Sequence, residues 1–147
     1  MHIGPYLFEE FKRFVENFHG YAAPGLLVGG YMVELAKRHL PEDTLFEAVV
    51  ESRKCLPDAV QLLTLCSTGN NWMKVHNLGR YAVSLFDKHT GEGVRVSIDP
   101  TQLATFRRMF PETAGSGGII ESPLRDIPAM MEALSSRSGT YKCNSNF

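Results

Sequence analysis

Apolar residues recur at steps of three and four positions in the N-terminal part of the chain, which is the spacing of helices that bury one face. Residues 6–18 show this pattern first. Their apolar positions are Leu7, Phe8, Phe11, Phe14, Val15 and Phe18. Gly20 suits the end of this helix because glycine adopts positive φ at little cost. Residues 26–39 repeat the pattern, and Gly29 and Gly30 within them indicate that another backbone or a ligand comes close.

Beyond residue 45 the pattern shortens into apolar runs separated by turn residues. A strand is predicted at residues 46–52, a short helix at residues 57–65, and strands at residues 72–77, 81–88 and 94–98. The last two strands form a hairpin around Gly91. Helices are predicted again at residues 99–110 and 124–134, the first starting with Asp99 as its N-cap.

This order of elements predicts an α+β fold, with helices packed on one small mixed or antiparallel sheet. The core order is α-β-α-β-β-β, with extra helices at the N- and C-terminal ends. A chain of 147 residues can bury a real core without disulfides or a structural metal. No repeat or linker divides it, so residues 1–147 are expected to form a single domain.

Charge and hydropathy narrow the partners and the compartment. The formal net charge is −1, so there is no basic excess to neutralise phosphates, and no nucleic acid partner is expected. No apolar run reaches the roughly 18 residues of a membrane helix. The first ten residues lack the order of a signal peptide, so a cytoplasmic protein with no membrane partner is expected.

Three side chains are candidates for chemistry. His19 stands in a glycine-bounded turn where ligands can reach the backbone, although a lone histidine is more often a surface residue. Cys55 precedes a predicted helix, whose N-terminus lowers the pKa of a thiol, although a buried structural cysteine is an equal alternative. Cys66 follows the same helix among apolar neighbours that indicate the edge of a core.

The spacing of Cys55 and Cys66 does not match a zinc motif, since the chain has no Cys-x-x-Cys pair. Eleven positions of unbroken helix span about 16 Å. A single zinc ion holds thiolate sulfurs at about 2.3 Å, so it cannot bridge that distance. A short helix bent back at both ends, a site shared between subunits, or a single functional thiol would each resolve the conflict, and the spacing leaves all three open.

Four segments, taken in order, resemble the FmdE family, which is named after a component of formylmethanofuran dehydrogenase. They are Phe-His-Gly-Tyr-Ala-Ala-Pro-Gly at residues 18–25, the Glu-to-Gln block at residues 51–61, Cys-Ser-Thr-Gly-Asn at residues 66–70, and Leu-Gly-Arg at residues 78–80 with the hairpin that follows. The resemblance extends over about residues 14–98 and therefore includes most of the chain.

The resemblance implies a metal-associated protein with the core order given above. It nominates His19, Cys55 and Cys66 as metal ligands, with Asp58 and Tyr21 lining the site. A transition metal is implied, zinc foremost, because a thiolate-rich ligand set suits that ion. A homodimer and metalloenzyme subunits are the partners that the family suggests. Its namesakes accompany an enzyme that reduces carbon dioxide onto methanofuran in methane-forming organisms.

Three functions remain open from the sequence. The first is a metal-binding accessory or subunit-like protein of anaerobic one-carbon metabolism. The second is a small enzyme in which Cys55 or zinc-bound water attacks a substrate and His19 acts as base. The third is an interaction subunit whose site no longer works.

Two departures from the family pattern bear on these alternatives. Tyr21 stands where relatives have a second histidine, and Ala23 stands where they have a cysteine, so the site is depleted or altered if those residues are ligands. Some members also carry a C-terminal zinc finger of paired cysteines. Only Cys143 is present in that region, so no such finger is expected.

Overall fold

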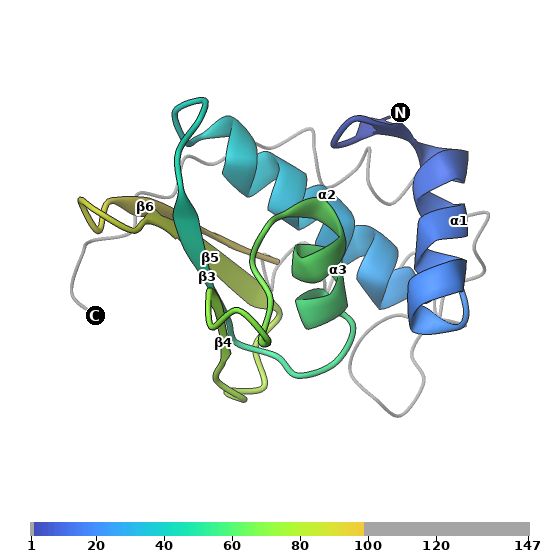
Figure 1. Cartoon of the computed structure of the whole chain (residues 1–147). Coiled ribbons are helices and arrows are strands. Elements are labelled where there is room, and N and C mark those ends of the chain that lie inside the picture. Colours follow the sequence, from blue (N-terminus) through green and yellow to red (C-terminus); the bar gives the residue numbers. More distant parts are fainter. Residues whose placement is uncertain (1, 99–147) are drawn as a thin grey trace.

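The structure is a computed structural model that describes residues 2–98 (Figure 1). Its elements are β1 (His2–Ile3), β2 (Tyr6–Leu7), α1 (Phe8–His19), α2 (Pro24–Arg38), β3 (Phe46–Val50), α3 (Leu56–Leu63), β4 (Met73–Val75), β5 (Ala82–Asp87) and β6 (Gly93–Ser97). These elements confirm the α+β class and the predicted core order. The helices predicted at residues 99–110 and 124–134 lie outside the described residues.

Four strands form a mixed sheet in the order β4-β3-β5-β6. β4 runs parallel to β3, while β5 and β6 run antiparallel to their neighbours. A parallel pair needs a crossover connection, and α3 supplies it between β3 and β4. The sheet face that contacts the helices is apolar, with Ala48, Val50, Val83 and Leu85 buried.

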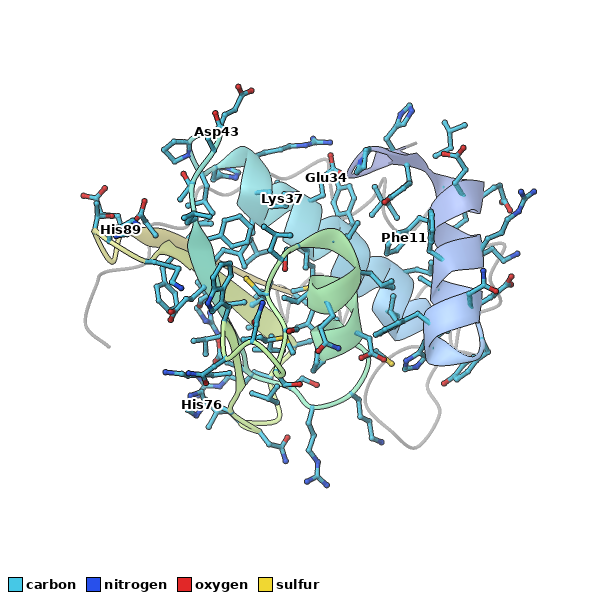
Figure 2. All side chains as sticks on the ribbon, in the orientation of Figure 1. Phe11, Glu34, Lys37, Asp43, His76 and His89 are labelled. Atoms are coloured by element: carbon cyan, nitrogen blue, oxygen red, sulfur yellow. The ribbon has the colours of Figure 1, made fainter. Side chains whose placement is uncertain are left out.

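Helix α2 is the centre of the described fold. It contacts β5 and β6 on one side and α3 on another, and α1 packs on α2 and α3 from outside the sheet (Figure 1). Its glycines allow these approaches, as the sequence predicted. Gly30 faces the Phe11 ring of α1, which lies between the two helices (Figure 2), and Gly29 faces Leu56 and Ala59 of α3.

The N-terminus differs from the sequence-based expectation. Helix α1 begins at Phe8, two residues later than predicted, because Tyr6–Leu7 pairs with His2–Ile3 in a small second sheet. Gly4 makes the turn at φ +61°, and its N–H donates to the Glu34 carboxylate on α2. The other end is as predicted, since Gly20 closes α1 with φ +95°.

None of the helices within residues 2–98 is both long and apolar enough to cross a membrane.

Replacing Gly30 with Ala is expected to destabilise the protein by about 1–2 kcal/mol. The added methyl carbon would lie 2.5 Å from the Phe11 ring, which is fully buried and cannot move aside. Overpacking of this kind costs about 1–3 kcal/mol, and the better helix propensity of Ala offsets about 1 kcal/mol. Urea denaturation followed by circular dichroism measures the difference in unfolding free energy.

Gly69→Ala is the matched control, because a methyl group there would come no closer than 3.8 Å to another side chain. The double variant Gly30→Ala/Phe11→Leu should recover part of the lost stability. An unchanged Gly30→Ala midpoint would contradict the tight packing of α1 on α2.

Candidate functional site

His19 and Asp58 form a direct polar contact between the end of α1 and the first turn of α3. The His19 Nδ1 atom lies 2.6 Å from Asp58 Oδ2, and the side chains are 19% and 31% exposed. A carboxylate only accepts hydrogen bonds, so the proton of the neutral imidazole is on Nδ1 and Nε2 keeps its lone pair. Metal-binding histidines are held by carboxylates in the same way.

Asp58 is held from its other side as well. The Gln61 side chain, one turn along α3, donates to Asp58 Oδ1 at 3.2 Å. The Gln61 carbonyl oxygen in turn accepts the N–H of Thr68 at 3.4 Å. The orientation of the His19 ring is therefore linked through two side chains to the loop that follows α3. Sequence reasoning placed Asp58 near the site but gave Gln61 no role.

Cys55 lies at the centre of a strained turn immediately before α3. Its backbone has φ +60° and ψ −50°, and the N–H of Leu56 donates to the carbonyl of Lys54 at 2.6 Å. This is a γ-turn of the positive-φ kind, which is rare for a residue with a side chain. Such strain costs about 1–3 kcal/mol and persists only where the surroundings impose it, as they often do at functional sites.

The start of α2 surrounds the Cys55 side chain. A Cβ atom built on Gly25 would lie 3.4 Å from Cys55 Sγ and 3.4 Å from the Tyr81 hydroxyl, so all three meet at one point. The N–H of Leu26 in the first turn of α2 can donate to the Cys55 sulfur. The close approach therefore requires glycine at position 25.

The sequence-based prediction of a lowered pKa for Cys55 is wrong. Burial raises the pKa of the Cys55 thiol, and the nearby Asp58 carboxylate raises it further. Lys54 and the Leu26 N–H lower it, but less than the other two causes raise it. The helix N-terminus is present as expected, but partial desolvation and a neighbouring negative charge outweigh it.

Tyr81 is a part of this site that the sequence did not reveal. It is buried at the start of β5, and its hydroxyl donates to the Gly25 carbonyl. Burial, followed by the neighbouring Cys55, raises the pKa of Tyr81 well above its usual value. A buried tyrosine normally finds a hydrogen-bond partner, but the partner here lies 56 positions away, so no local pattern could identify it.

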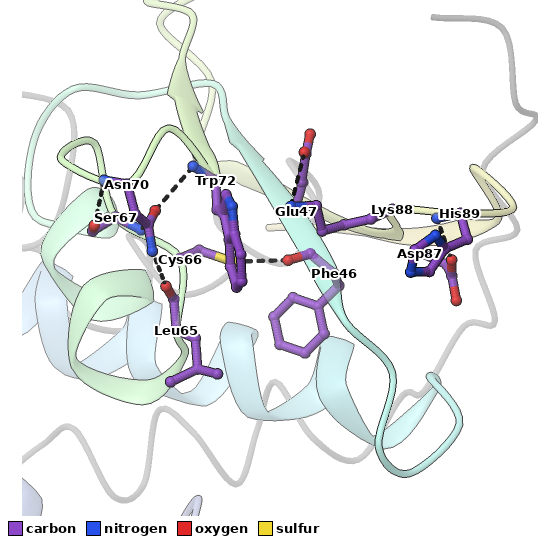
Figure 3. A network of polar contacts seen from close by, with 10 residues as sticks. All are labelled: Phe46, Glu47, Leu65, Cys66, Ser67, Asn70, Trp72, Asp87, Lys88 and His89. Carbon is purple, nitrogen blue, oxygen red and sulfur yellow. Dashed lines mark hydrogen bonds and ion pairs between the residues drawn. The ribbon is translucent and has the colours of Figure 1, made fainter.

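Cys66 belongs to a different part of the fold. Its side chain is buried, and its thiol donates to the Phe46 carbonyl at 3.3 Å (Figure 3). Burial raises the pKa of the Cys66 thiol. The two cysteines thus lie beyond opposite ends of α3, with Cys55 against α2 and Cys66 against β3.

The polar loop after Cys66 is closed by Asn70 (Figure 3). The Asn70 side-chain oxygen accepts the N–H groups of Ser67 and Trp72, each at 3.0 Å. Its amide nitrogen donates to the Leu65 carbonyl at 2.6 Å. The Cys66-to-Asn70 segment that resembles the family pattern therefore has a structural use in this chain, which is to shape the turn into β4.

Within residues 2–98, no three His, Cys, Asp or Glu side chains converge closely enough to hold one metal ion. The structure brings His19 to Asp58 and places Cys55 within electrostatic range of Asp58, but it leaves Cys66 apart. Tyr21 is 61% exposed, with its ring centroid 5.3 Å from that of His19. A metal site of His19, Cys55 and Cys66 therefore stays a prediction.

Comparisons with known proteins agree with the motifs. The model of the FmdE family, described as molybdenum formylmethanofuran dehydrogenase operon, matches residues 18–133. The crystal structure of an FmdE-like protein of tungsten formylmethanofuran dehydrogenase from Syntrophus aciditrophicus is 42% identical, with a TM-score of 0.76. The match covers 91% of this chain and 73% of that one.

Two curated relatives match over smaller shares of their length. A probable S-adenosyl-L-methionine-binding protein of Archaeoglobus fulgidus is 32% identical over 107 residues, which are 67% of this chain and 28% of the relative. A probable D-serine dehydratase of Chromobacterium violaceum is 66% identical over 32 residues, 22% of this chain and 7% of the relative. The chain thus spans less than a third of either relative. With the family match extending over most of its length, the chain belongs to the FmdE family.

Proposed function

We propose that this chain is a metal-binding accessory or subunit-like protein that works with a metalloenzyme of anaerobic one-carbon metabolism in the cytoplasm. Family membership supports the link to formylmethanofuran dehydrogenase. The observation that carries the metal-binding part is the 2.6 Å contact of His19 Nδ1 with Asp58, which leaves Nε2 available next to the Cys55 region.

The chemistry of these donors fits zinc. An imidazole nitrogen and a thiolate sulfur are among its ordinary ligands, and zinc sites use three or four protein ligands, with water completing a three-ligand set. His19 and Cys55 supply two donors, so the others would come from a second copy of the chain, another protein or residues outside 2–98. This shortfall supports a homodimer or a complex as the working form. When bound, zinc would supply Lewis-acid chemistry or tie the subunits together.

The alternative of a cysteine nucleophile receives less support. A nucleophilic cysteine works as its thiolate, and burial together with Asp58 raises the pKa of Cys55. A metal ion can still displace the thiol proton, because metal binding and deprotonation are coupled. The raised pKa therefore favours a ligand role for Cys55 over a nucleophilic one.

Zinc titration of the full chain, purified without a histidine tag, is expected to show stoichiometric binding that depends on His19 and Cys55. His19→Ala and Cys55→Ser should each abolish it, since each removes one of two donors. Equilibrium dialysis with metal analysis measures binding, and repeating it over a range of protein concentrations reveals a site shared between copies.

Cys66→Ser is the matched control, because it changes the other described thiol, which donates to the Phe46 carbonyl. It should keep zinc stoichiometry even if it lowers stability. Absence of stoichiometric metal in the unmodified chain, or full binding by Cys55→Ser, would sink the proposal.

Asp58→Asn is expected to have opposite effects on metal affinity and thiol reactivity. Losing the carboxylate that orients His19 should weaken zinc binding about 10- to 100-fold. The same change removes a charge that raises the pKa of Cys55, so metal-free protein should alkylate about two- to fivefold faster at pH 8. Iodoacetamide rates are measured in a Cys66→Ser/Cys143→Ser background, where Cys55 is the sole thiol.

Gln61→Glu provides a comparison for Asp58→Asn, because it places a new carboxylate beside Asp58 without removing the one that holds His19. It should keep zinc binding closer to that of the unmodified chain. If Asp58→Asn leaves both zinc affinity and alkylation rate unchanged, Asp58 neither orients His19 nor acts on Cys55.

A further inference from the structure

The sheet face opposite the helices carries a hollow of about 850 Å³. Side chains alternate between the two faces of a strand, so the neighbours of the buried Ala48, Val50, Val83 and Leu85 point to this outer side. The hollow is lined by Val49, Phe86, Ser84, Lys74, His76 and Thr90, among others. His76 lies on the side of the sheet away from α2 (Figure 2).

Strand register places four of the residues on this side in one row across the sheet. Lys74 is opposite Val49, Val49 is opposite Ser84, and Ser84 is opposite Arg95. Neighbouring strands lie about 4.8 Å apart, so the row carries a hydroxyl and an apolar side chain between two cations. Phe86 is next but one to Ser84 on β5 and adds an aromatic surface on the same side.

The carboxylates of the hollow already have cationic partners. Glu51 receives two hydrogen bonds from Arg95, at 2.6 and 3.0 Å, and has Arg80 at 3.9 Å. Glu47 lies 3.7 Å from the Lys88 ammonium group. A cationic ligand would therefore have to compete with these ion pairs.

Three donors in the hollow are not engaged in this way. The side chains of Lys74, His76 and Ser84 make no hydrogen bond or ion pair with any other residue in the 2–98 range. Ser84 is only 6% exposed, so its hydroxyl belongs to the floor rather than to the outer surface. Four cations, from the lining and its ion-pair partners, stand against the two carboxylates. They are Lys74, Arg80, Lys88 and Arg95.

We propose that this hollow binds a small organic anion, a carboxylate with an apolar body. The apolar part lies on Val49 and Phe86, and the carboxylate oxygens accept hydrogen bonds from Lys74 and Ser84. The volume is within the range of about 300–1,000 Å³ that small-molecule sites occupy, and an apolar floor with a few convergent donors is typical of them. This site is separate from His19, Asp58 and Cys55, which lie on the helical side of the sheet.

The test uses phenylacetate as the probe and its neutral counterpart phenylacetamide as the matched ligand. Two-dimensional amide NMR of the full chain is recorded during titration with each. Phenylacetate is expected to shift the amides around Val49, Ser84 and Phe86 in a saturable way. Phenylacetamide, which has nearly the same shape but no charge, should bind at least about threefold more weakly, the size of one partly exposed charge interaction.

Two variants address the donors. Lys74→Gln should weaken phenylacetate binding about threefold and leave phenylacetamide binding unchanged, because only the charge interaction is lost. Ser84→Ala should weaken phenylacetate binding by a similar factor through the lost hydrogen bond. Lys12→Gln on α1 is the control and should bind like the unmodified chain.

Several results would overturn the proposal. Equal affinities for the acid and the amide would show that charge plays no part, and an unchanged affinity in Lys74→Gln would remove the assigned donor. Shifts confined to α2 and α3 would place the ligand elsewhere. Absence of saturable shifts, as expected if another segment or a second copy of the chain fills the hollow, would also reject it.

Discussion

The close approach of three elements to α2 determines where everything else in the described fold lies. The contacts are Gly30 with Phe11, Gly29 with Leu56 and Ala59, and Gly25 with Cys55 and Tyr81. Side chains at these positions of α2 would keep the neighbours at a distance, whereas glycine lets them come to van der Waals contact. Because α1 and α3 both pack against this surface, the end of one meets the start of the other, and His19 can reach Asp58.

The same packing explains the electrostatics of the site. Cys55 is pressed between two helix N-termini, which favour a thiolate, but the close contact also excludes water, which disfavours it. Asp58 decides the balance, because it orients His19 and at the same time repels a charge on Cys55. A cation placed between imidazole and thiol would reverse this balance, since it would attract both the carboxylate and the thiolate. The geometry therefore suits a site that is completed by a metal ion better than a free reactive thiol.

Local features of this chain could be predicted from its sequence, and distant contacts could not. The apolar spacing predicted α1 and α2, and Gly20 marked the end of α1 because a positive φ favours glycine. The β1–β2 pairing was not predicted because strands of two residues have no measurable period. The hydrogen bond from Tyr81 to Gly25 joins residues 56 positions apart, and nothing near either residue signals the other.

The spacing of the two described cysteines shows how far a geometric argument from sequence can reach. Helix α3 runs from Leu56 to Leu63, about 12 Å, and the chain beyond it takes Cys66 to β3 rather than back toward Cys55. A helix bent back at both ends is therefore not what brings the thiols together. What remains is a single functional thiol or a site completed by a second copy, and both agree with two donors, His19 and Cys55, in the described part of one copy. The departures at Tyr21 and Ala23 point the same way, because they remove donors from the turn that carries His19.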